Sequence, residues 1–590
     1  MRQIILFLMV MAVLPLAAQK SSFDEFRKQQ RSQFERTKAD QQAKYDAFRR
    51  EVNEKYAEFM RKPWGEADEQ EADTIVPEQS VRPYIVFDEQ DSENASDTGA
   101  EEDYMAEEGR EARGEGLEED SLLANGDIKP FSAEAAPPVN REDAPGDSLL
   151  VIGDSSLVIG DSLLAINDSV EEDTFVIKWE KVLPIPVPKA SVNTEPVQIP
   201  VRSVALIMPG VAPAPKPIAP VAPKAVPQKP VSIAYYGAII TIQFPKDDPL
   251  KIRELTENGI ADAWLQLSDS IYDNTIKSAL DVRKKSKLCD WAYMDMLRQV
   301  TEKQYGQTNE AVLAQAFIMT QSGYRIRIGR NETQLYLLSA SQYDIFALRY
   351  FMIDGSKFYI VNGERNAKMF ICEAKIDKEQ PLSMQMADLP QIGDEQTPKR
   401  TFVSRKGMES STSVNKNLID FFNNYPQACY KGEQSTRWVA YANTPLENSI
   451  KKMLYPPLQQ YIKDKSEKDA VTLLLNWVQT AFAYEYDDKV WGGDRAFFAQ
   501  ETLFYPYCDC EDRSILFSRL VRDLMNLDVI FLYYPGHLAT AVGFKDDVQG
   551  DWVEYNGKKY VVCDPTYINA GVGRTMPGMN NQQAQIIALK

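Results

Sequence analysis

Aromatic residues recur every 11 positions near the start of the chain. The repeat has two phases, occupied by Phe23, Phe34, Tyr45 and Tyr56 and by Phe26, Phe48 and Phe59. Eleven residues make three helical turns, so these aromatics line one stripe of a long helix over residues 20–64. Pro63 and Gly65 are expected to end it. The stripe fits either a helix on the protein's own surface, or self-association or partner binding through residues 23–62.

The second half of the chain alternates between helix-like and strand-like patterns. Apolar spacing predicts helices between 250 and 321, and short alternating stretches predict strands between 324 and 402. Polar residues near 390–415 indicate a boundary, after which helical patterns return at 447–461 and 467–484. We therefore predict an α+β fold class, with a helical plus β domain over 232–410 and a second domain over 411–590.

The segments between these parts have the composition of linkers. Residues 65–182 are acidic and of low complexity, and residues 146–170 carry a seven-residue repeat that begins with Gly-Asp. We expect disorder here, with the repeat either adding strands to a partner or serving no specific role. Residues 183–231 are rich in proline and predict a semi-rigid spacer with a reach on the order of 100 Å.

Charge and the N-terminus restrict partners and compartment. The net charge of −20 argues against nucleic acid, because binding it requires basic residues. Residues 1–19 resemble a secretory signal peptide, with a basic residue, a short apolar run and small residues at the end. No later segment predicts a membrane span. We expect a periplasmic protein; an uncleaved signal anchor is the alternative.

One pattern near the C-terminus carries candidate chemistry. The chain has a single histidine, His537, with Cys510 before it and Asp564 after it. A helical pattern follows Cys510, His537 opens a strand after Pro535-Gly536, and the turn signal at 556–557 predicts a hairpin that ends just before Asp564. Cysteine, histidine and aspartate are the nucleophile, the general base and the orienting acid of a thiol acyl-transfer triad. We predict that these three side chains converge.

The position of Cys510 at a helix start affects its acidity. Backbone N–H groups and the helix dipole there stabilise a thiolate and lower the pKa of a cysteine. The neighbouring charges of Glu511 and Asp512 oppose this effect. We expect the imidazolium of His537 to supply the remaining stabilisation.

These motifs resemble the transglutaminase-like superfamily of papain-type cysteine enzymes. Its bacterial members share Gly-Asp-Cys-Glu/Asp-Asp before a helix, His at a strand start and Asp-Pro-Thr after the next strand, which are matched at 509–512, at His537 and at 564–566. The resemblance covers residues 470–575 and implies catalytic roles for Cys510, His537 and Asp564. One departure is Cys508, which stands where the family has glycine.

Alternatives to a catalytic triad remain open. Cys508, Cys510, Cys563 and His537 form a possible Cys₃His zinc set, although Cys-x-Cys spacing is unusual and leaves Asp564 without a role. His537 can also be an ordinary structural histidine, or the chain a pseudoenzyme that binds without cleaving. We find no EF-hand pattern and expect neither a cofactor nor a metal. Disulfide connectivity is not predicted.

Residues 250–365 show the same order of helix, strands and glycine turn as the C-terminal domain. With helix laid on helix, Gln307 matches Cys510 and Asn309 matches Asp512, and no cysteine or histidine stands at the reactive positions. This predicts a degenerate, catalytically silent repeat.

The expected function is therefore that of an exported transglutaminase-like cysteine peptidase, amidase or acyltransferase acting on a protein or peptide substrate. Hydrolysis is slightly preferred to transamidation, because water needs no second binding site. The alternative is a non-catalytic envelope scaffold, in which the N-terminal helix and linkers carry the function.

Overall fold

The computed structural model describes residues 2–74, 84–85, 175–176, 185–186, 195–205, 207–361 and 369–589. Met1–Val86 and Thr174–Lys590 form one compact unit. The predicted repeat at 146–170 lies outside the described residues. The described part combines helices with mainly antiparallel sheets, which is compatible with the predicted α+β class.

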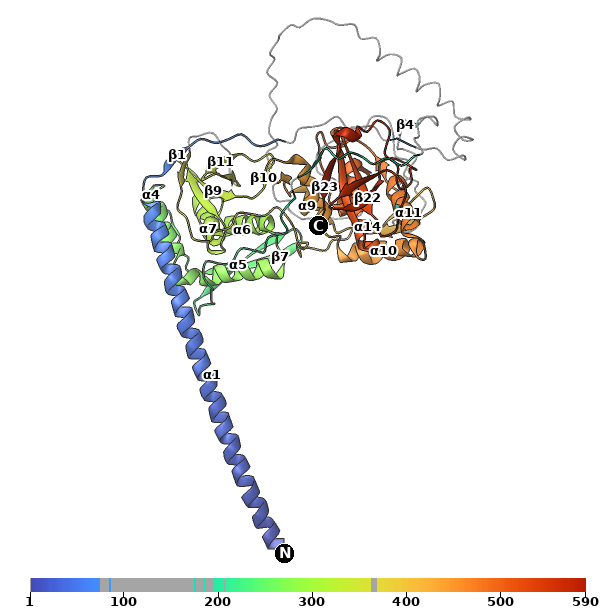
Figure 1. Ribbon diagram of the computed structural model, residues 1–590. Coiled ribbons are helices and arrows are strands. Elements are labelled where there is room, and N and C mark those ends of the chain that lie inside the picture. The colour runs from blue at the N-terminus through green and yellow to red at the C-terminus, as the bar shows by residue number, and fades with distance from the viewer. Residues whose placement is uncertain are drawn as a thin grey trace, which may run out of the picture. The chain divides into compact units, whose positions relative to one another are not determined.

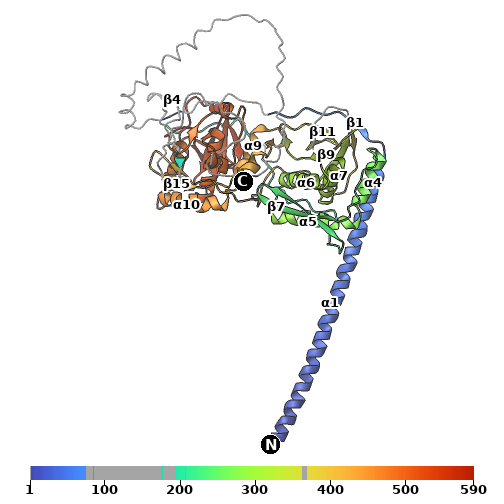
Figure 2. The same ribbon diagram turned by 180° about the vertical axis from the view of Figure 1, so that it is seen from behind.

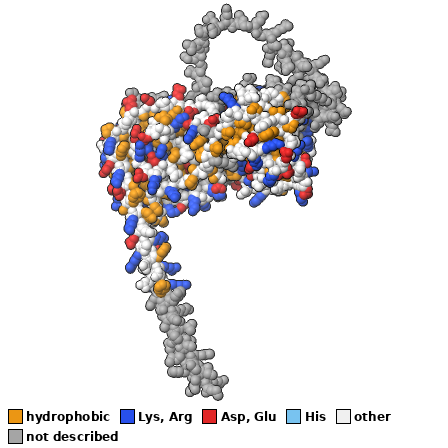
Figure 3. All heavy atoms as spheres, in the orientation of Figure 1, with side chains coloured by type: hydrophobic (Ala, Val, Ile, Leu, Met, Phe, Trp, Pro, Cys, Tyr) orange, Lys and Arg blue, Asp and Glu red, His pale blue; other side chains and the backbone are white. Residues whose placement is uncertain are grey.

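The first element is the long helix α1 (Arg2–Met60), whose C-terminal end packs against α4 (Glu257–Leu267) (Figure 1). The Tyr56 ring stacks on Trp264 with ring centroids 4.6 Å apart, and the Trp264 indole donates a hydrogen bond to Asn53. Tyr56 is 3% exposed, whereas Phe34, in the same phase of the repeat, is 65% exposed. Figure 3 shows hydrophobic side chains exposed along the described part of α1. The aromatic stripe therefore joins the core only at its C-terminal end.

This division predicts different effects for two substitutions in one phase of the repeat. Tyr56→Ala should lower the free energy of unfolding by about 3 kcal/mol, because it empties a buried aromatic site. Phe34→Ala should change it by less than about 0.5 kcal/mol, because that ring is exposed. Denaturant unfolding measures both values. Equal effects would show that α1 does not pack as described.

Helices and a hairpin follow α1 in the first half of the body. The hairpin of β6 (Gln228–Tyr235) and β7 (Ala238–Pro245) packs on α5 and α6, as Figures 1 and 2 both show. The helices are α4, α5 (Asp273–Lys285), α6 (Asp290–Tyr305) and α7 (Asn309–Gln321). Thr256 caps α4 by accepting a hydrogen bond from the Gly259 N–H, as expected for a threonine before a helix.

A six-stranded sheet with the order β1-β13-β8-β9-β12-β11 packs against α7. Its strands are β1 (Gly65–Ala67), β8 (Ile326–Arg330), β9 (Leu335–Ala340), β11 (Tyr350–Ile353), β12 (Ser356–Ile360) and β13 (Met369–Cys372). Two smaller sheets pair β10 (Asp344–Ile345) with β16 (Ala428–Cys429), and β14 (Arg400–Val403) with β15 (Glu409–Thr412) and β3 (Phe175–Val176).

The C-terminal part places helices around a second six-stranded sheet with the order β21-β22-β20-β19-β23-β5. Its strands are β5 (Ser203–Val204), β19 (Asp528–Tyr534), β20 (His537–Gly543), β21 (Trp552–Tyr555), β22 (Lys558–Cys563) and β23 (Gln585–Ala588). The helices are α8 (Lys416–Asn423), α9 (Arg437–Asn443), α10 (Asn448–Ile462), α11 (Glu467–Thr480), α12 (Asp487–Val490), α13 (Ala499–Phe504) and α14 (Cys510–Met525).

The two large sheets share a strand order. Helix α7 precedes β8, β9, β11 and β12, which pair in the order β8-β9-β12-β11, and helix α14 precedes β19, β20, β21 and β22, which pair in the order β19-β20-β22-β21. A later antiparallel strand then flanks the first strand of each set, β13 beside β8 and β23 beside β19.

Two expectations about the linkers are corrected by the structure. The described part of the proline-rich segment does not stand apart from the body as the predicted semi-rigid spacer: Ile199 and Arg202 donate backbone hydrogen bonds to Trp552 and Ala584, and β5 pairs with β23. Its non-proline residues still carry N–H groups, and several of these pair with the body. Residues 65–74 are also ordered, because β1 adds to the edge of the first sheet and Asp73 forms an ion pair with Lys357. Within the described ranges, no helix has the length and apolar character that a membrane span requires.

Candidate active site

Cys510 is the first residue of α14, and the residues around it fix the start of that helix. Asp509 precedes it with an extended backbone, and the Asp512 carboxylate accepts hydrogen bonds from the backbone N–H groups of Phe497 and Asp509. An acid at the third position of a helix that bonds back to the residue before the helix is a usual way to fix its start. Asp512 therefore has a structural role that positions Cys510.

His537 and Asp564 meet across the second sheet. His537 opens β20 and Asp564 follows β22, and these strands pair antiparallel with Thr540 opposite Cys563. The His537 Nε2 atom lies 2.8 Å from Asp564 Oδ2, with both side chains buried. Asp564 Oδ1 accepts a hydrogen bond from the Thr566 N–H at 2.8 Å, which fixes the carboxylate. Two of the three predicted residues are therefore in direct contact.

The orientation of the imidazole leaves its other nitrogen available. An ionised carboxylate only accepts hydrogen bonds, so the ring donates from Nε2, and Nδ1 of the neutral ring is then an acceptor. His537 Nδ1 is buried and has no hydrogen-bond partner among the described residues. With the ring in this orientation, Nδ1 is the atom that could accept a proton, as a general base must.

Contacts between α14 and β20 place Cys510 on the same cavity as His537, but the Cys510 thiol bonds to Glu511, and among the described residues no hydrogen bond joins it to His537. Ser514, one turn after Cys510, donates a hydrogen bond of 2.7 Å to the carbonyl of Leu538. The Leu538 backbone N–H in turn interacts with the Cys510 sulfur and favours its ionised form. Cys510 and His537 both line one cavity of about 400 Å³. Gln479 donates hydrogen bonds to the Asp564 and Tyr567 carbonyls and so holds the third predicted residue in place.

The segment 432–438 also lines this cavity. Arg437 forms an ion pair of 2.6 Å with Asp494, and its guanidinium lies over the Trp438 ring. Arg437 Nε and Trp438 Nε1 are buried and have no acceptor within the ranges that the structure describes. Sequence analysis missed these two residues, because nothing in the sequence links them to a nucleophile more than 70 positions away.

No protein-family model, curated protein or solved structure matches this chain. The chemistry of the cavity is therefore inferred from its own residues.

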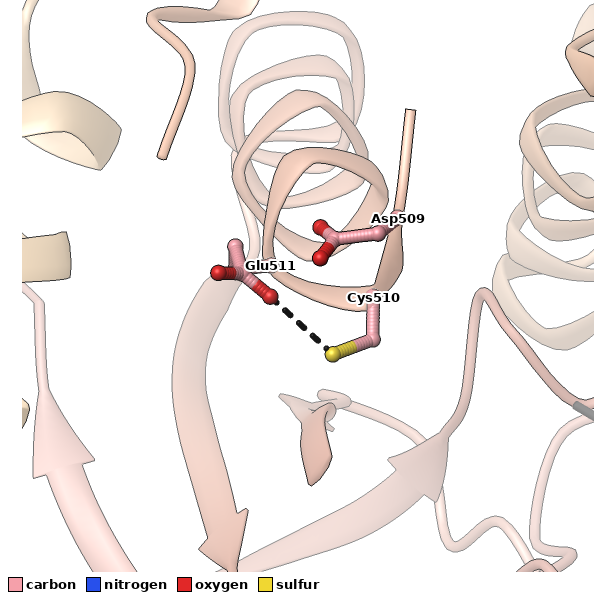
Figure 4. Close-up of side chains that lie close together, drawn as sticks. All are labelled: Asp509, Cys510 and Glu511. Carbon is pink, nitrogen blue, oxygen red and sulfur yellow. Dashed lines mark hydrogen bonds between the residues drawn. The ribbon is translucent and has the colours of Figure 1, made fainter. Parts of the chain in front are cut away.

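The prediction that the helix start lowers the pKa of Cys510 is wrong, because the sulfur is buried next to negative charges. The thiol donates a hydrogen bond of 3.1 Å to the Glu511 carboxylate, as Figure 4 shows. Burial raises the pKa of Cys510 well above its ordinary value, and the charges of Glu511 and Asp509 raise it further. The helix start was expected to lower this pKa, but burial and two carboxylates outweigh it. The raised pKa favours the thiol form of Cys510 over the thiolate.

Further carboxylates gather next to the sulfur. The carboxylate oxygens of Asp487, Asp509 and Asp512 lie within 4.8 Å of one another, as do those of Asp487, Asp494 and Glu511. Burial, followed by the neighbouring carboxylates, raises the pKa of Asp487 to about 8 and those of Asp509 and Asp512 well above their ordinary range. Sequence analysis, which expected no metal, did not predict this cluster of carboxylates. Carboxylate oxygens are the ligands that hard cations prefer.

The Cys₃His zinc set is not assembled. The Cys508 and Cys563 thiols donate to the carbonyls of Ala483 and Val561, and His537 Nε2 is occupied by Asp564. Among the described residues, no trio of candidate ligand atoms within 4.8 Å includes Cys508, Cys563 or His537. All six cysteines are described, and all are free.

Removing the charge of Glu511 should make the Cys510 thiol more reactive. Glu511→Gln keeps the shape of the side chain but removes the second largest cause of the raised Cys510 pKa, so more thiolate is present at neutral pH. Alkylation of Cys510 by iodoacetamide should become several-fold faster, with its pH dependence displaced to lower pH. Intact mass spectrometry in the presence of EDTA measures the rate.

Asp488→Asn is the matched control, because it removes a carboxylate that is exposed and outside the cavity. Its rate should equal that of the unchanged protein. An unchanged or slower rate in Glu511→Gln would contradict the electrostatic account of the site.

Proposed function

We propose that this chain is a thiol enzyme that acts on peptide or amide bonds through Cys510, His537 and Asp564. The observation that carries the proposal is the hydrogen bond between His537 Nε2 and Asp564, which leaves Nδ1 unpartnered within the described residues, in a side chain that lines one cavity with Cys510. A nucleophile and a base around one cavity, with an acid orienting the base, is the arrangement that acyl transfer requires.

In the proposed reaction, His537 Nδ1 takes the proton of Cys510 as the sulfur attacks the carbonyl carbon. The C–N bond of the substrate then breaks, and the imidazolium gives its proton to the departing amine, which leaves a thioester on Cys510. Water adds to the thioester with His537 again as base, releasing a carboxylic acid and restoring the thiol. Asp564 stays ionised and stabilises the imidazolium in both steps.

The oxyanion formed in each step needs hydrogen-bond donors. The backbone N–H of Cys510 lies at the start of α14, where N–H groups have no partner within the helix. We propose it as one donor. Hydrolysis is preferred to transamidation, because water reaches the thioester without a second binding site; an amine in place of water would give a cross-link.

We further propose that the fold is transglutaminase-like and that residues 250–365 are a degenerate copy. Support for the copy comes from the shared strand order of the two sheets. Asn309 is the first residue of α7, as Cys510 is the first residue of α14. Asn309 therefore corresponds to Cys510, whereas the sequence alignment matched Gln307, two residues earlier, with Cys510. Asn309 bonds to the backbone of Thr333 and Leu335 at the start of β9, and Val361 follows β12 where Asp564 follows β22. The copy would therefore be silent.

A second candidate is a non-catalytic scaffold of the cell envelope. Two observations favour it: the aromatic residues exposed on α1, and the raised pKa of Cys510. In that case the cavity would bind a peptide without cleaving it, and Cys510→Ala would leave the function intact.

A comparison of peptide termini and cross-links tests the proposal. Envelope proteins would be analysed by mass spectrometry from cells with the unchanged chain, with Cys510→Ala and without the chain. The proposal predicts new termini, or new isopeptide links, that occur only with the unchanged chain. Identical products from the Cys510→Ala chain would assign the function to binding.

A further inference from the structure

The side chains around Cys510 provide recognition groups that acyl transfer itself does not use. Glu511 lines the cavity, is 6% exposed and donates nothing; it accepts the hydrogen bond of the Cys510 thiol. Within the described residues, no lysine or arginine forms an ion pair with it. A buried carboxylate that faces a cavity without a cationic partner is costly, and a cationic ligand removes that cost.

The segment 432–438, which lines the same cavity, offers the complementary groups. Arg437 and Trp438 are each more than nine-tenths buried and line the cavity, and their Nε–H and Nε1–H groups have no acceptor in the described part of the chain. A buried donor without an acceptor leaves a hydrogen bond that a ligand in the cavity can complete. These two side chains suit an oxygen acceptor such as a peptide carbonyl.

We propose that this cavity recognises the free α-amino group of the residue whose carbonyl is attacked, with Glu511 binding the ammonium and Arg437 and Trp438 binding carbonyl oxygens further along the chain. This inference rests on the proposed function and specifies its substrate class: peptides with an unmodified N-terminus, from which one residue is released at a time.

The short distance between Glu511 and the Cys510 sulfur favours an α-ammonium group over other cations. Glu511 Oε2 is 3.1 Å from the Cys510 sulfur, so a group bound by Glu511 lies next to the carbon that the sulfur attacks. An α-nitrogen is only two bonds from its own carbonyl carbon, whereas a lysine ammonium is many bonds away. The volume of about 400 Å³ also suits an organic ligand of a few residues. An ammonium bound by Glu511 competes with the thiol for that carboxylate, so binding also frees the thiol to donate to His537.

Two covalent probes test the inference without knowledge of the natural substrate. Alanyl chloromethyl ketone carries a free α-amino group, and its N-acetyl twin does not. In both, the Cys510 sulfur displaces chloride and forms a thioether. Intact mass spectrometry in EDTA measures the labelling rate of each probe, and iodoacetamide measures the general reactivity of the thiol.

The unchanged chain should react with the free-amine probe about tenfold faster, or more, than with the acetylated twin, as expected for one charge-assisted hydrogen bond. In Glu511→Gln the ratio of the two labelling rates should fall to near one. The ratio is compared, and not the rates themselves, because this substitution changes the reactivity of the thiol toward both probes alike. Asp488→Asn, which removes an exposed carboxylate outside the cavity, should keep the ratio.

Two results would overturn the inference. One is equal labelling by the two probes in the unchanged chain, and the other is a preference that survives in Glu511→Gln or appears only when a divalent cation is added. Failure of the proposed function gives a different result: the iodoacetamide rate would then be the same with and without His537, whatever the probe ratio.

Discussion

Replacing His537 with alanine is expected to lower turnover by about 10⁴-fold or more. The substrate for this measurement is a peptide found in the comparison of termini. The loss follows from the acidity of Cys510: burial and the charges of Glu511 and Asp509 raise its pKa, which disfavours ionisation of the thiol unless a base takes its proton. His537 lines the same cavity as Cys510, and its Nδ1 has no partner among the described residues and is the proposed base.

The matched control for this prediction is Cys510→Ala. The two substitutions should lower turnover by about the same factor, because neither residue acts without the other. Circular dichroism should show unchanged secondary structure in both variants. A His537→Ala protein that retains turnover within tenfold would show that another group takes the proton of Cys510.

Replacing Asp564 with asparagine is expected to lower turnover by about 10³- to 10⁴-fold while the protein stays folded. The carboxylate accepts a hydrogen bond from the Nε2–H group of His537. The proton therefore stays on Nε2, and Nδ1 is left able to accept a hydrogen bond. An amide can donate to Nε2 instead, which favours the tautomer with the proton on Nδ1, and that tautomer cannot take the proton of Cys510. The amide oxygen can still accept the Thr566 N–H, so the loop should keep its position.

Asp551→Asn is the control for this substitution. Asp551 also accepts backbone hydrogen bonds, from Val197 and Thr575, but it lies outside the cavity. It should lower stability slightly and leave turnover unchanged. Equal losses of turnover in Asp551→Asn and Asp564→Asn would indicate a general effect on folding and not a change of tautomer.

Local sequence patterns were sufficient to predict where the site residues lie along their elements. The start of α14 at Cys510, the start of β20 at His537 and the end of β22 just before Asp564 follow from apolar periodicity and from the turns at Gly536 and Gly557. These signals are short-range, and the antiparallel pairing of neighbouring strands then brings His537 to Asp564.

Properties that depend on burial or on distant segments were not predicted. The sign of the pKa shift of Cys510 depends on how deeply the sulfur is buried, which the sequence does not state. Arg437 and Trp438 reach the cavity from a separate helix. The proline content of residues 183–231 predicted a semi-rigid spacer, yet the N–H groups of Ile199 and Arg202 bond to the second sheet.

The central claim is that Cys510, His537 and Asp564 act as one unit, and the labelling rate of Cys510 tests it most directly. Iodoacetamide labelling would be followed across pH in the unchanged protein, His537→Ala, Asp564→Asn and the double variant. The account predicts slower labelling at neutral pH in both single variants, and a double variant no slower than His537→Ala alone. A labelling rate that is the same in the unchanged protein and in His537→Ala would contradict the account, because the sulfur would then react without the imidazole.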